Sequence, residues 1–225
     1  TGTTTDVHLP KTVSGGAMAR IKRTNTTGSW YIFDTVRGVN KSLKWDDITA
    51  EDTSTFTNQN LAGTTLTLPS ALATGTYLIE VFYVGEYFQI STYTGTGSAH
   101  AKSFPSALDS AAGFGWVRRY QSAASGNMVY HSALGGTQFF QSEGPSAAGT
   151  SSTVWNNADA TTTQFTVGTN DVVNKNGQLY VAYHWANSGP YAFGSYIGNS
   201  NADGPMINVG GYPITSVIKR VNAAS

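Results

Sequence analysis

Hydrophobic and polar residues alternate over short stretches of this chain, and these stretches predict β-strands. Residues 18–23 place Ala19 and Ile21 on one face and basic residues on the other, which is the period of a half-exposed strand. Residues 30–33 are apolar at every position, which predicts a strand covered on both faces. Residues 76–84 carry the strongest strand pattern. Because segments rich in Gly, Asn, Ser and Thr separate these stretches, the pattern predicts an all-β protein.

The strand pattern recurs with a period close to one hundred residues. The segment that begins at Gly75 matches the one that begins at Gly177, a shift of 102 that sets Glu80 against Ala182. Further matches have shifts of 98, 99 and 103: Gly28 with Gly126, Leu66-Thr67-Leu68 with Phe165-Thr166-Val167, and Ser91–Gly95 with Gly194–Gly198. Agreement between separate segments indicates a duplicated unit.

The repeat predicts three parts of the chain. Residues 1–86 form a first module that lacks its first strand, and residues 87–187 form a second module. Residues 188–225 are the start of a third module or a segment for strand exchange. We expect tandem antiparallel β-sandwich modules of the jelly-roll type. Both ends of the sequence fall inside a repeat, which indicates either a piece of a longer array or terminal strands that pair with something outside these residues.

Several motifs of the repeat can be compared with known families. They are Gly-Ser-Trp-Tyr-Ile-Phe-Asp at 28–34, Thr-Gln-Phe-Thr-Val-Gly at 163–168, Asn-Gly-Gln-Leu-Tyr-Val-Ala-Tyr at 176–183, Phe-Gly-Ser-Tyr-Ile-Gly-Asn at 193–199 and Val-Ile-Lys-Arg at 217–220. In this order they resemble a repeat domain of uncharacterised function that is frequent in tail-fibre and other virion proteins of phages, marine phages especially. The resemblance implies a β-sandwich module on the outside of a phage particle, and it carries over no catalytic residues. The second unit departs from the pattern, with Met128 at the place of Trp30 and Ser132 at the place of Asp34.

Composition narrows the classes of partner. Lys and Arg total 13 and Asp and Glu total 13, so nothing favours binding to nucleic acid or to an anionic membrane surface. The chain has no cysteine, which excludes disulfides and thiolate metal sites. No apolar run approaches the roughly 20 residues of a membrane helix, so we expect no membrane insertion.

Glu80 and Glu86 are the best candidates for a catalytic pair, because paired carboxylates about 5 to 10 Å apart hydrolyse glycosidic bonds. Six residues along one straight strand span about 20 Å, and Glu86 falls in a turn. A Gly-x-Ser-x-Gly elbow and a phosphate-binding loop are both missing from the sequence. We therefore do not expect an enzyme.

Metal or cofactor binding has weak candidates only. The acidic stretch 46–52 contains hard oxygen ligands of the kind that calcium prefers, but it lacks EF-hand spacing and reads better as a solvated loop. The four histidines have no zinc-type spacing, and His184 is expected in a strand with one wet edge. The histidines are His8, His100, His131 and His184. We expect no metal and no cofactor.

The five tryptophans are the remaining candidates for binding a ligand. Trp45 and Trp155 lie in polar, loop-like surroundings, where an exposed indole can stack on the apolar face of a sugar ring. They are our candidate ligand-binding residues. Trp30, Trp116 and Trp185 are expected in the core or at module interfaces. The basic residues beside Trp30 recur at Arg118-Arg119 and Lys219-Arg220, so we interpret the hairpin that contains them as a repeated structural joint.

The leading hypothesis is a structural module of a phage virion, in a tail fibre or as a head decoration. Its place would be the virion surface, where repeats give reach and where weak contacts with host cell-surface polysaccharide multiply through tethering. We expect partners through edge strands in residues 1–10 or 188–225, with copies of the chain or other virion proteins, and hence a homo-oligomer. The alternatives are a secreted bacterial carbohydrate-binding or adhesin repeat and, third, a polysaccharide-degrading enzyme.

Overall fold

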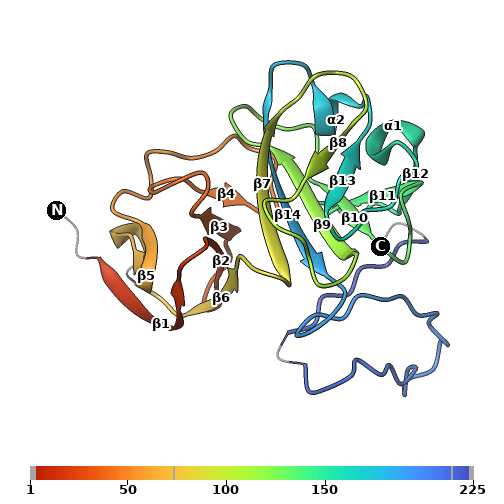
Figure 1. The fold of residues 1–225 in the computed structure, drawn as a ribbon. Helices are drawn as coiled ribbons and strands as arrows, with labels where there is room; N and C mark the ends of the chain where they lie inside the picture. The colour runs from red at the N-terminus through yellow and green to blue at the C-terminus, as the bar shows by residue number, and fades with distance from the viewer. Residues whose placement is uncertain (1–3, 73, 214, 223–225) are drawn as a thin grey trace.

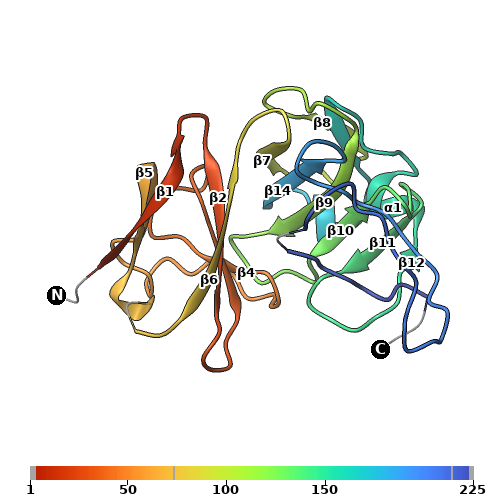
Figure 2. The same ribbon diagram turned by 90° about the horizontal axis from the view of Figure 1, so that it is seen from below.

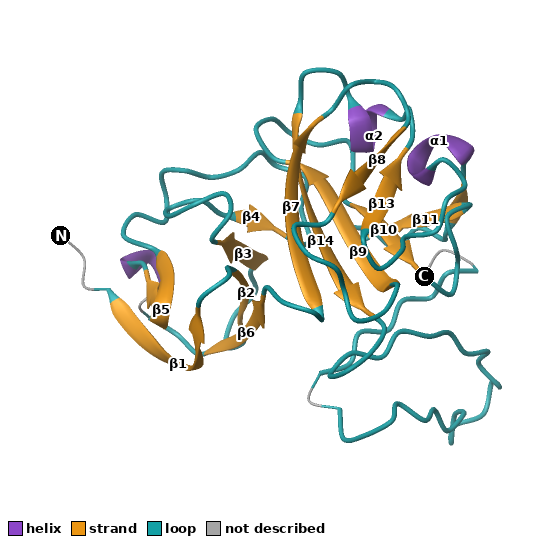
Figure 3. Cartoon of the chain, in the orientation of Figure 1, coloured by secondary structure: helices purple, strands orange, loops and turns teal. Residues whose placement is uncertain are grey.

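The computed structural model describes residues 4–72, 74–213 and 215–222. Their secondary structure is mainly antiparallel strand joined by turns and loops (Figure 3), which confirms the predicted all-β class. Helix is limited, in this part of the chain, to three single turns. The outermost residues of the predicted first and third parts, 1–3 and 223–225, lie outside the described residues.

The first half of the chain forms a two-layer sandwich (Figure 1). One layer has four strands in the order β4-β3-β2-β6, and the other pairs β1 with β5. Ala19, Ile21, Phe33 and Leu66 fill the space between the layers and are fully buried. The elements are β1 (Thr5–Val13), β2 (Ala17–Arg23), β3 (Trp30–Asp34), β4 (Leu43–Lys44), β5 (Asn60–Leu68), the 3-10 turn η1 (Ser70–Leu72) and β6 (Tyr77–Tyr83).

The second half forms a larger sandwich. Six strands lie in the order β12-β11-β10-β9-β14-β7, and β8 pairs with β13 as a separate layer. Tyr93, Val117, Phe165 and Tyr180 are among the buried residues that join these two layers. The elements are β7 (Phe88–Thr94), β8 (His100–Ser103), β9 (Ala112–Arg119), β10 (Met128–His131), β11 (Gln138–Gln141), β12 (Gly149–Thr150), α1 (Ser152–Trp155), β13 (Gln164–Val167), α2 (Asp171–Asn174) and β14 (Leu179–Ala186).

The two sandwiches stack through the free faces of their large sheets. Met18 and Ile32 of the four-stranded sheet share one buried cluster with Trp116, Val181 and Tyr183 of the six-stranded sheet. The ribbon shows the two halves against each other in both views (Figures 1 and 2). The molecule is thus a stack of four β layers with three apolar cores, one of which lies between the halves.

Both large sheets have the same strand order. β6, β2, β3 and β4 are neighbours in the first, and β14, β9, β10 and β11 are neighbours in the second. The pairing sets Glu80 opposite Arg20 and Val181 opposite Arg118. Glu80 therefore corresponds to Val181, one residue away from the match with Ala182 that sequence comparison indicates, and a slip of one residue exchanges the faces of a strand.

Strand β2 differs from the half-exposed strand that its pattern predicts. Ala17 to Ile21 are all buried, and Arg20 is only 9% exposed. Met18, on the same face as Arg20, packs against the second large sheet, and Arg20 itself is covered by Trp30, Trp45 and Glu80. Alternation of apolar and polar residues marks the two faces of β2 correctly, but both faces are buried.

The C-terminal segment after β14 has no helix or strand among its described residues, 187–213 and 215–222. It extends as a long loop beneath the second half (Figure 1). The Ala148 amide donates to the Val221 carbonyl at 2.9 Å, and Lys219 Nζ donates to the Gly144 carbonyl. Large apolar side chains are exposed along the segment, and Ile197 is 91% exposed.

Candidate functional site

The polar joint between the two sandwiches is built around Arg118. Arg118 lies on β9, is 0% exposed, and reaches the loop between β4 and β5. Its Nη1 donates to the Lys44 carbonyl at 2.9 Å and to the Asp47 carbonyl, and its Nη2 donates to the Thr49 carbonyl. Burial lowers the pKa of Arg118 to about 10. A buried guanidinium has to be matched by acceptors, and here the loop carbonyls supply them.

Neighbouring side chains of the second sandwich hold the same loop. Asn127 Nδ2 donates to the Trp45 and Asp47 carbonyls, each at 3.1 Å. The Ser142 hydroxyl donates to the Trp45 carbonyl at 3.0 Å and accepts from Trp116 Nε1 at 2.9 Å. Donors of one half thus pair with backbone carbonyls of the other, so the loop over residues 44–49 has a fixed position.

A second polar contact joins the halves at Asp34. The Asp34 carboxylate accepts from Arg37 Nε at 2.5 Å and from the Tyr183 hydroxyl at 2.6 Å. Arg37 also pairs with Glu51 at 2.9 Å. Burial alone would lower the pKa of Arg37, but Asp34, Tyr183 and Glu51 hold it above its ordinary value. Burial raises the pKa of Tyr183 well above its ordinary value, so the phenol stays a donor.

A row of aromatic rings and one guanidinium borders this joint. The Arg20 guanidinium lies 4.7 Å from the ring centre of Trp30 and 5.0 Å from that of Trp45. Trp45 stacks on Trp116 with 5.0 Å between ring centres. Glu80 holds Arg20 in place through an ion pair of 2.5 Å. We call Trp30, Arg20, Trp45 and Trp116 the aromatic row, of which Trp30 and Trp45 are half-buried and Trp116 is fully buried.

The two predicted ligand-binding residues therefore lie in different settings. Trp45 keeps a partly open ring in the aromatic row. Trp155, at the end of α1, is 2% exposed and belongs to the core of the second sandwich. Its indole has no face open to a sugar in this structure, and the structure does not bring it together with Trp45.

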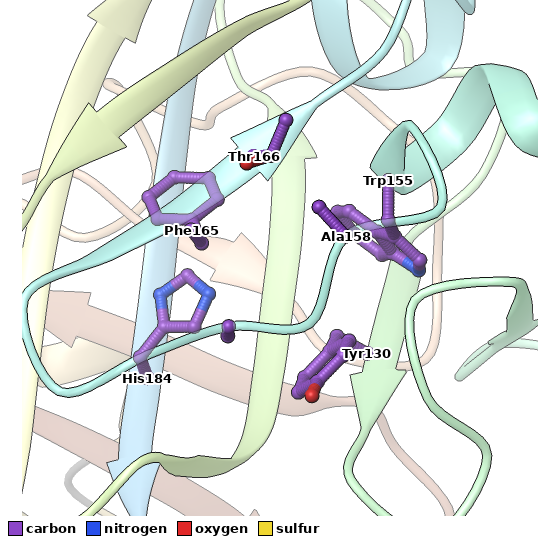
Figure 4. A pocket seen from close by; sticks show the side chains of 7 residues that line it. Tyr130, Trp155, Ala158, Phe165, Thr166 and His184 are labelled. Atoms are coloured by element: carbon purple, nitrogen blue, oxygen red, sulfur yellow. The ribbon is translucent and has the colours of Figure 1, made fainter.

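His184 lies in the same core as Trp155, at a small pocket lined also by Tyr130 and Phe165 (Figure 4). Its ring centre is 4.3 Å from that of Phe165, and it is 1% exposed. The wet edge expected from sequence is wrong, because β8 and β13 cover this face of β14. Neither ring nitrogen has a hydrogen-bond partner among the described residues. Burial lowers the pKa of His184 to about 3, so the ring is neutral.

The acidic side chains of residues 46–52 form separate ion pairs and hydrogen bonds and do not converge on one site. Asp47 pairs with Lys44 at 3.2 Å and Glu51 pairs with Arg37. Asp52 accepts from the Ser54 and Thr55 amides at 2.8 and 2.9 Å. Within the described ranges, no group of three or more His, Cys, Asp or Glu side chains is placed to hold a metal ion.

The carboxylates considered for catalysis also have separate places. Glu80 is engaged by Arg20 inside the molecule, whereas Glu86 is exposed in the turn between β6 and β7. The sequence does not mark Arg118 and Asn127, which build the joint, as site residues. The only signal for Arg118 is the recurrence of basic residues at Arg20 and Arg118, and no local pattern marks Asn127.

No helix in the described part of the chain has the length and apolar character of a membrane span. No curated protein and no solved structure matches the chain. One family model matches residues 84–225, which is more than half of the chain and begins in the turn before β7. The chain therefore belongs to the family described as a domain of unknown function, DUF7483.

Proposed function

We propose that this chain is a structural module of a phage virion, in a tail fibre or as a head decoration, that gives reach and displays a weak sugar-contact surface. The observation that carries the structural part is the joint around Arg118. Pairing between a buried guanidinium on one half and three carbonyls on the other fixes the two halves in one relative position. A linked pair of sandwiches with such a joint acts as a stiff spacer.

The joint around Arg118 has an energetic cost that simple adhesion between the two sheets would not require. Burying an arginine has a desolvation cost that its hydrogen bonds have to offset, and an apolar contact could hold two sheets together without it. Directional hydrogen bonds to three separate carbonyls, of Lys44, Asp47 and Thr49, constrain the geometry more tightly than an apolar contact does. This supports a role in which the angle between successive sandwiches matters, as in a fibre or a surface lattice.

The sugar-contact part of the proposal rests on the aromatic row. Trp30 and Trp45 keep partly open rings, and the Lys22 ammonium lies 6.0 Å from the ring centre of Trp30. An indole ring buries the apolar face of a pyranose, and neighbouring polar groups bind its hydroxyls. A shallow surface of this kind gives low affinity, which becomes useful when many copies act together. Trp30 carries the contact in this proposal, because Trp45 packs on Trp116.

The location of the protein, on phage particles or in a bacterial surface or secreted fraction, can be tested directly. Antibodies raised against the 225-residue chain are applied to phage particles purified by density gradient and to bacterial surface and secreted fractions. Labelling of nucleic-acid-containing particles supports the virion role. Labelling confined to a bacterial secreted or surface fraction would instead support the alternative, a carbohydrate-binding or adhesin repeat.

The sugar contact is tested with cell-surface polysaccharide immobilised on beads at several densities. We expect retention of the chain that rises steeply with density, and loss of retention on Trp30→Ala. Ser29→Ala, at the neighbouring position, is the matched control and should be retained. Retention that is the same for Trp30→Ala and for the unchanged chain would contradict the assignment of this surface.

A further inference from the structure

We propose that residues 194–197 of one copy pair as an antiparallel strand with the outer edge of β6, at residues 78–81, in a second copy. The inference extends the proposed structural role to a named partner surface. It concerns backbone pairing between copies and does not depend on sugar contact. Three observations carry it: the open edge of β6, the likeness of the C-terminal segment to β7, and the place where that segment is anchored.

The first observation is the difference between β6 and β14, which hold the same position in their sheets. β14 has β9 on one side and β7 on the other, and Tyr180 to Ala186 are all buried. β6 has β2 on one side, and no other strand of the described chain pairs with it. All seven of its residues are partly or fully exposed, and Leu78 is 44% exposed. A strand edge with unpaired backbone groups and apolar side chains is a template for another strand.

The second observation identifies a suitable strand. Residues 191–198 match residues 88–95, which contain β7, at a shift of 103. Tyr191 and Phe193 stand where β7 has Phe88 and Ile90, and Tyr196 stands where β7 has Tyr93. β7 pairs along the edge of β14. The matching segment therefore has side chains suited to pairing along a strand edge, yet it forms no strand and residues 194–198 are exposed.

The pairing of β7 with β14 gives the register. Thr94 lies opposite Leu179, and Tyr93 lies opposite Tyr180. Leu179 corresponds to Leu78 through the pairing of β14 with β9 and of β6 with β2. Carried over to β6, this register places Ile197 opposite Leu78 and Tyr196 opposite Ile79. Two of the exposed apolar side chains of the molecule, Ile197 and Leu78, then cover each other.

The third observation decides between pairing within one chain and pairing between copies. Phe193 stacks on Phe114 of its own second sandwich with 5.6 Å between ring centres. Asn187 accepts from the Phe193 amide at 2.8 Å and donates to its carbonyl at 3.2 Å. The register within one chain would require Phe193 to lie opposite Phe82 and to leave this anchor. Tyr191 already lies 6.2 Å from Phe82 of its own chain, between ring centres, whereas residues 194–197 are exposed beyond the anchor, so pairing with a second copy leaves the anchor in place.

Such a contact joins two different surfaces, the edge of β6 and the C-terminal segment. One-way contacts of this kind build rings or open linear arrays, and reciprocal exchange of the two segments gives a closed two-fold dimer. Four paired residues give a weak single contact, because the ends of such a short strand fray. Repetition along an array is what would make it persistent.

The experiment uses cysteine pairs, since the chain has no cysteine of its own. Leu78→Cys in one sample is mixed with Ile197→Cys in another, and disulfide formation is followed on non-reducing gels. Directly opposite residues on antiparallel strands have Cβ atoms about 4.5–5.5 Å apart, close to the separation that a disulfide bridges. Both positions are exposed, so neither substitution disturbs a core. We expect covalent dimers to form at least about tenfold faster than with the control pair, Leu78→Cys and Tyr196→Cys, in which the side chains are on opposite faces.

Three results would overturn the proposal. They are equal rates for the two pairs, no disulfide in either mixture, or a disulfide that forms inside a single chain carrying both Leu78→Cys and Ile197→Cys at high dilution. Sedimentation velocity gives an independent measurement. Ile197→Asp should weaken self-association by about tenfold or more, which corresponds to about 1.4 kcal/mol. Retention on polysaccharide through Trp30 is measured on the same chain, so a failure of the strand pairing leaves the sugar contact separately testable.

Discussion

The hydroxyl of Tyr183 donates a hydrogen bond of 2.6 Å to Oδ2 of Asp34, and the two residues come from different sandwiches, 149 positions apart in the chain. Asp34 lies at the end of β3 and its Oδ1 also accepts from the Val36 and Arg37 amides at 3.0 and 2.8 Å. One carboxylate thus fixes the turn after β3 and the contact between the two large sheets. The fold within the first half is therefore coupled to the docking of the second.

Replacing Tyr183 with Phe tests that coupling. The change removes one donor to a buried carboxylate and leaves the ring in the apolar cluster between the sheets. A hydrogen bond to a charged group contributes roughly 1.5–3 kcal/mol, so we expect a loss of that size in the free energy of unfolding measured with urea. Tyr196→Phe, at a half-exposed ring in the C-terminal segment, is the control and should change stability little. Equal stability of the two variants would contradict the role given to the hydroxyl.

Replacing Arg118 with Met should have the largest effect at the joint. The methionine leaves the carbonyls of Lys44, Asp47 and Thr49 without their shared donor. A buried acceptor left without its donor costs roughly 1–3 kcal/mol, and more than one carbonyl loses its donor here, so the free energy of unfolding should fall further than for Tyr183→Phe. Hydrogen exchange should also speed up at the amides of the loop between β4 and β5.

The adjacent Arg119 provides the control for this experiment. Its side chain is half-buried and, among the described residues, donates only to the nearby Ala123 carbonyl. Arg119→Met should cost less than about 1 kcal/mol. If the two methionine variants were equally stable, Arg118 would not be the centre of the joint.

These contacts also show what the sequence could and could not predict. Period-two alternation located most of β2 and its two faces, because that signal is local. The burial of the polar face is not local, since the groups that cover Arg20 come from the loop at Trp45 and from β6. Asn127 had no pattern to mark it, because its acceptors are 80 and 82 positions away. The polar neighbours of Trp155 predict an exposed ring, but α1 turns the ring into the core.

The buried His184 predicts a pH dependence of stability. Its pKa is about 3 in the folded chain and about 6.5 when exposed, so between these values the unfolded state binds a proton that the folded state does not. The free energy of unfolding should therefore fall as pH decreases from about 6.5 towards 3, by at most about 1.4 kcal/mol for each pH unit from this group. Well above pH 6.5 the His184 ring is neutral in both states, so it no longer makes the free energy of unfolding depend on pH.

His184→Phe isolates this contribution, since Phe cannot be protonated and suits the contacts with Phe104 and Phe165. The readout is the slope of stability against pH between 4 and 6.5, taken from urea unfolding at each pH, and the expected slope is shallower in the variant. Crowding of the larger ring against Gly115 can lower stability at every pH without changing that slope. Parallel curves for the two proteins would show that His184 is not the responsible group.

Glu80→Gln separates a structural carboxylate from a catalytic one. Glu80 and Arg20 form an ion pair of 2.5 Å between side chains that are 11% and 10% exposed. The amide keeps one hydrogen bond but loses the charge, so Arg20 would stay over Trp30 and Trp45 with a weaker partner. We expect a loss of roughly 1–3 kcal/mol in the free energy of unfolding. Glu86→Gln is the matched control, because its carboxylate is exposed in a turn, and its stability should not change. Incubation of the unchanged chain with polysaccharide should release no reducing ends, and release that both substitutions abolish would overturn the structural assignment of this pair.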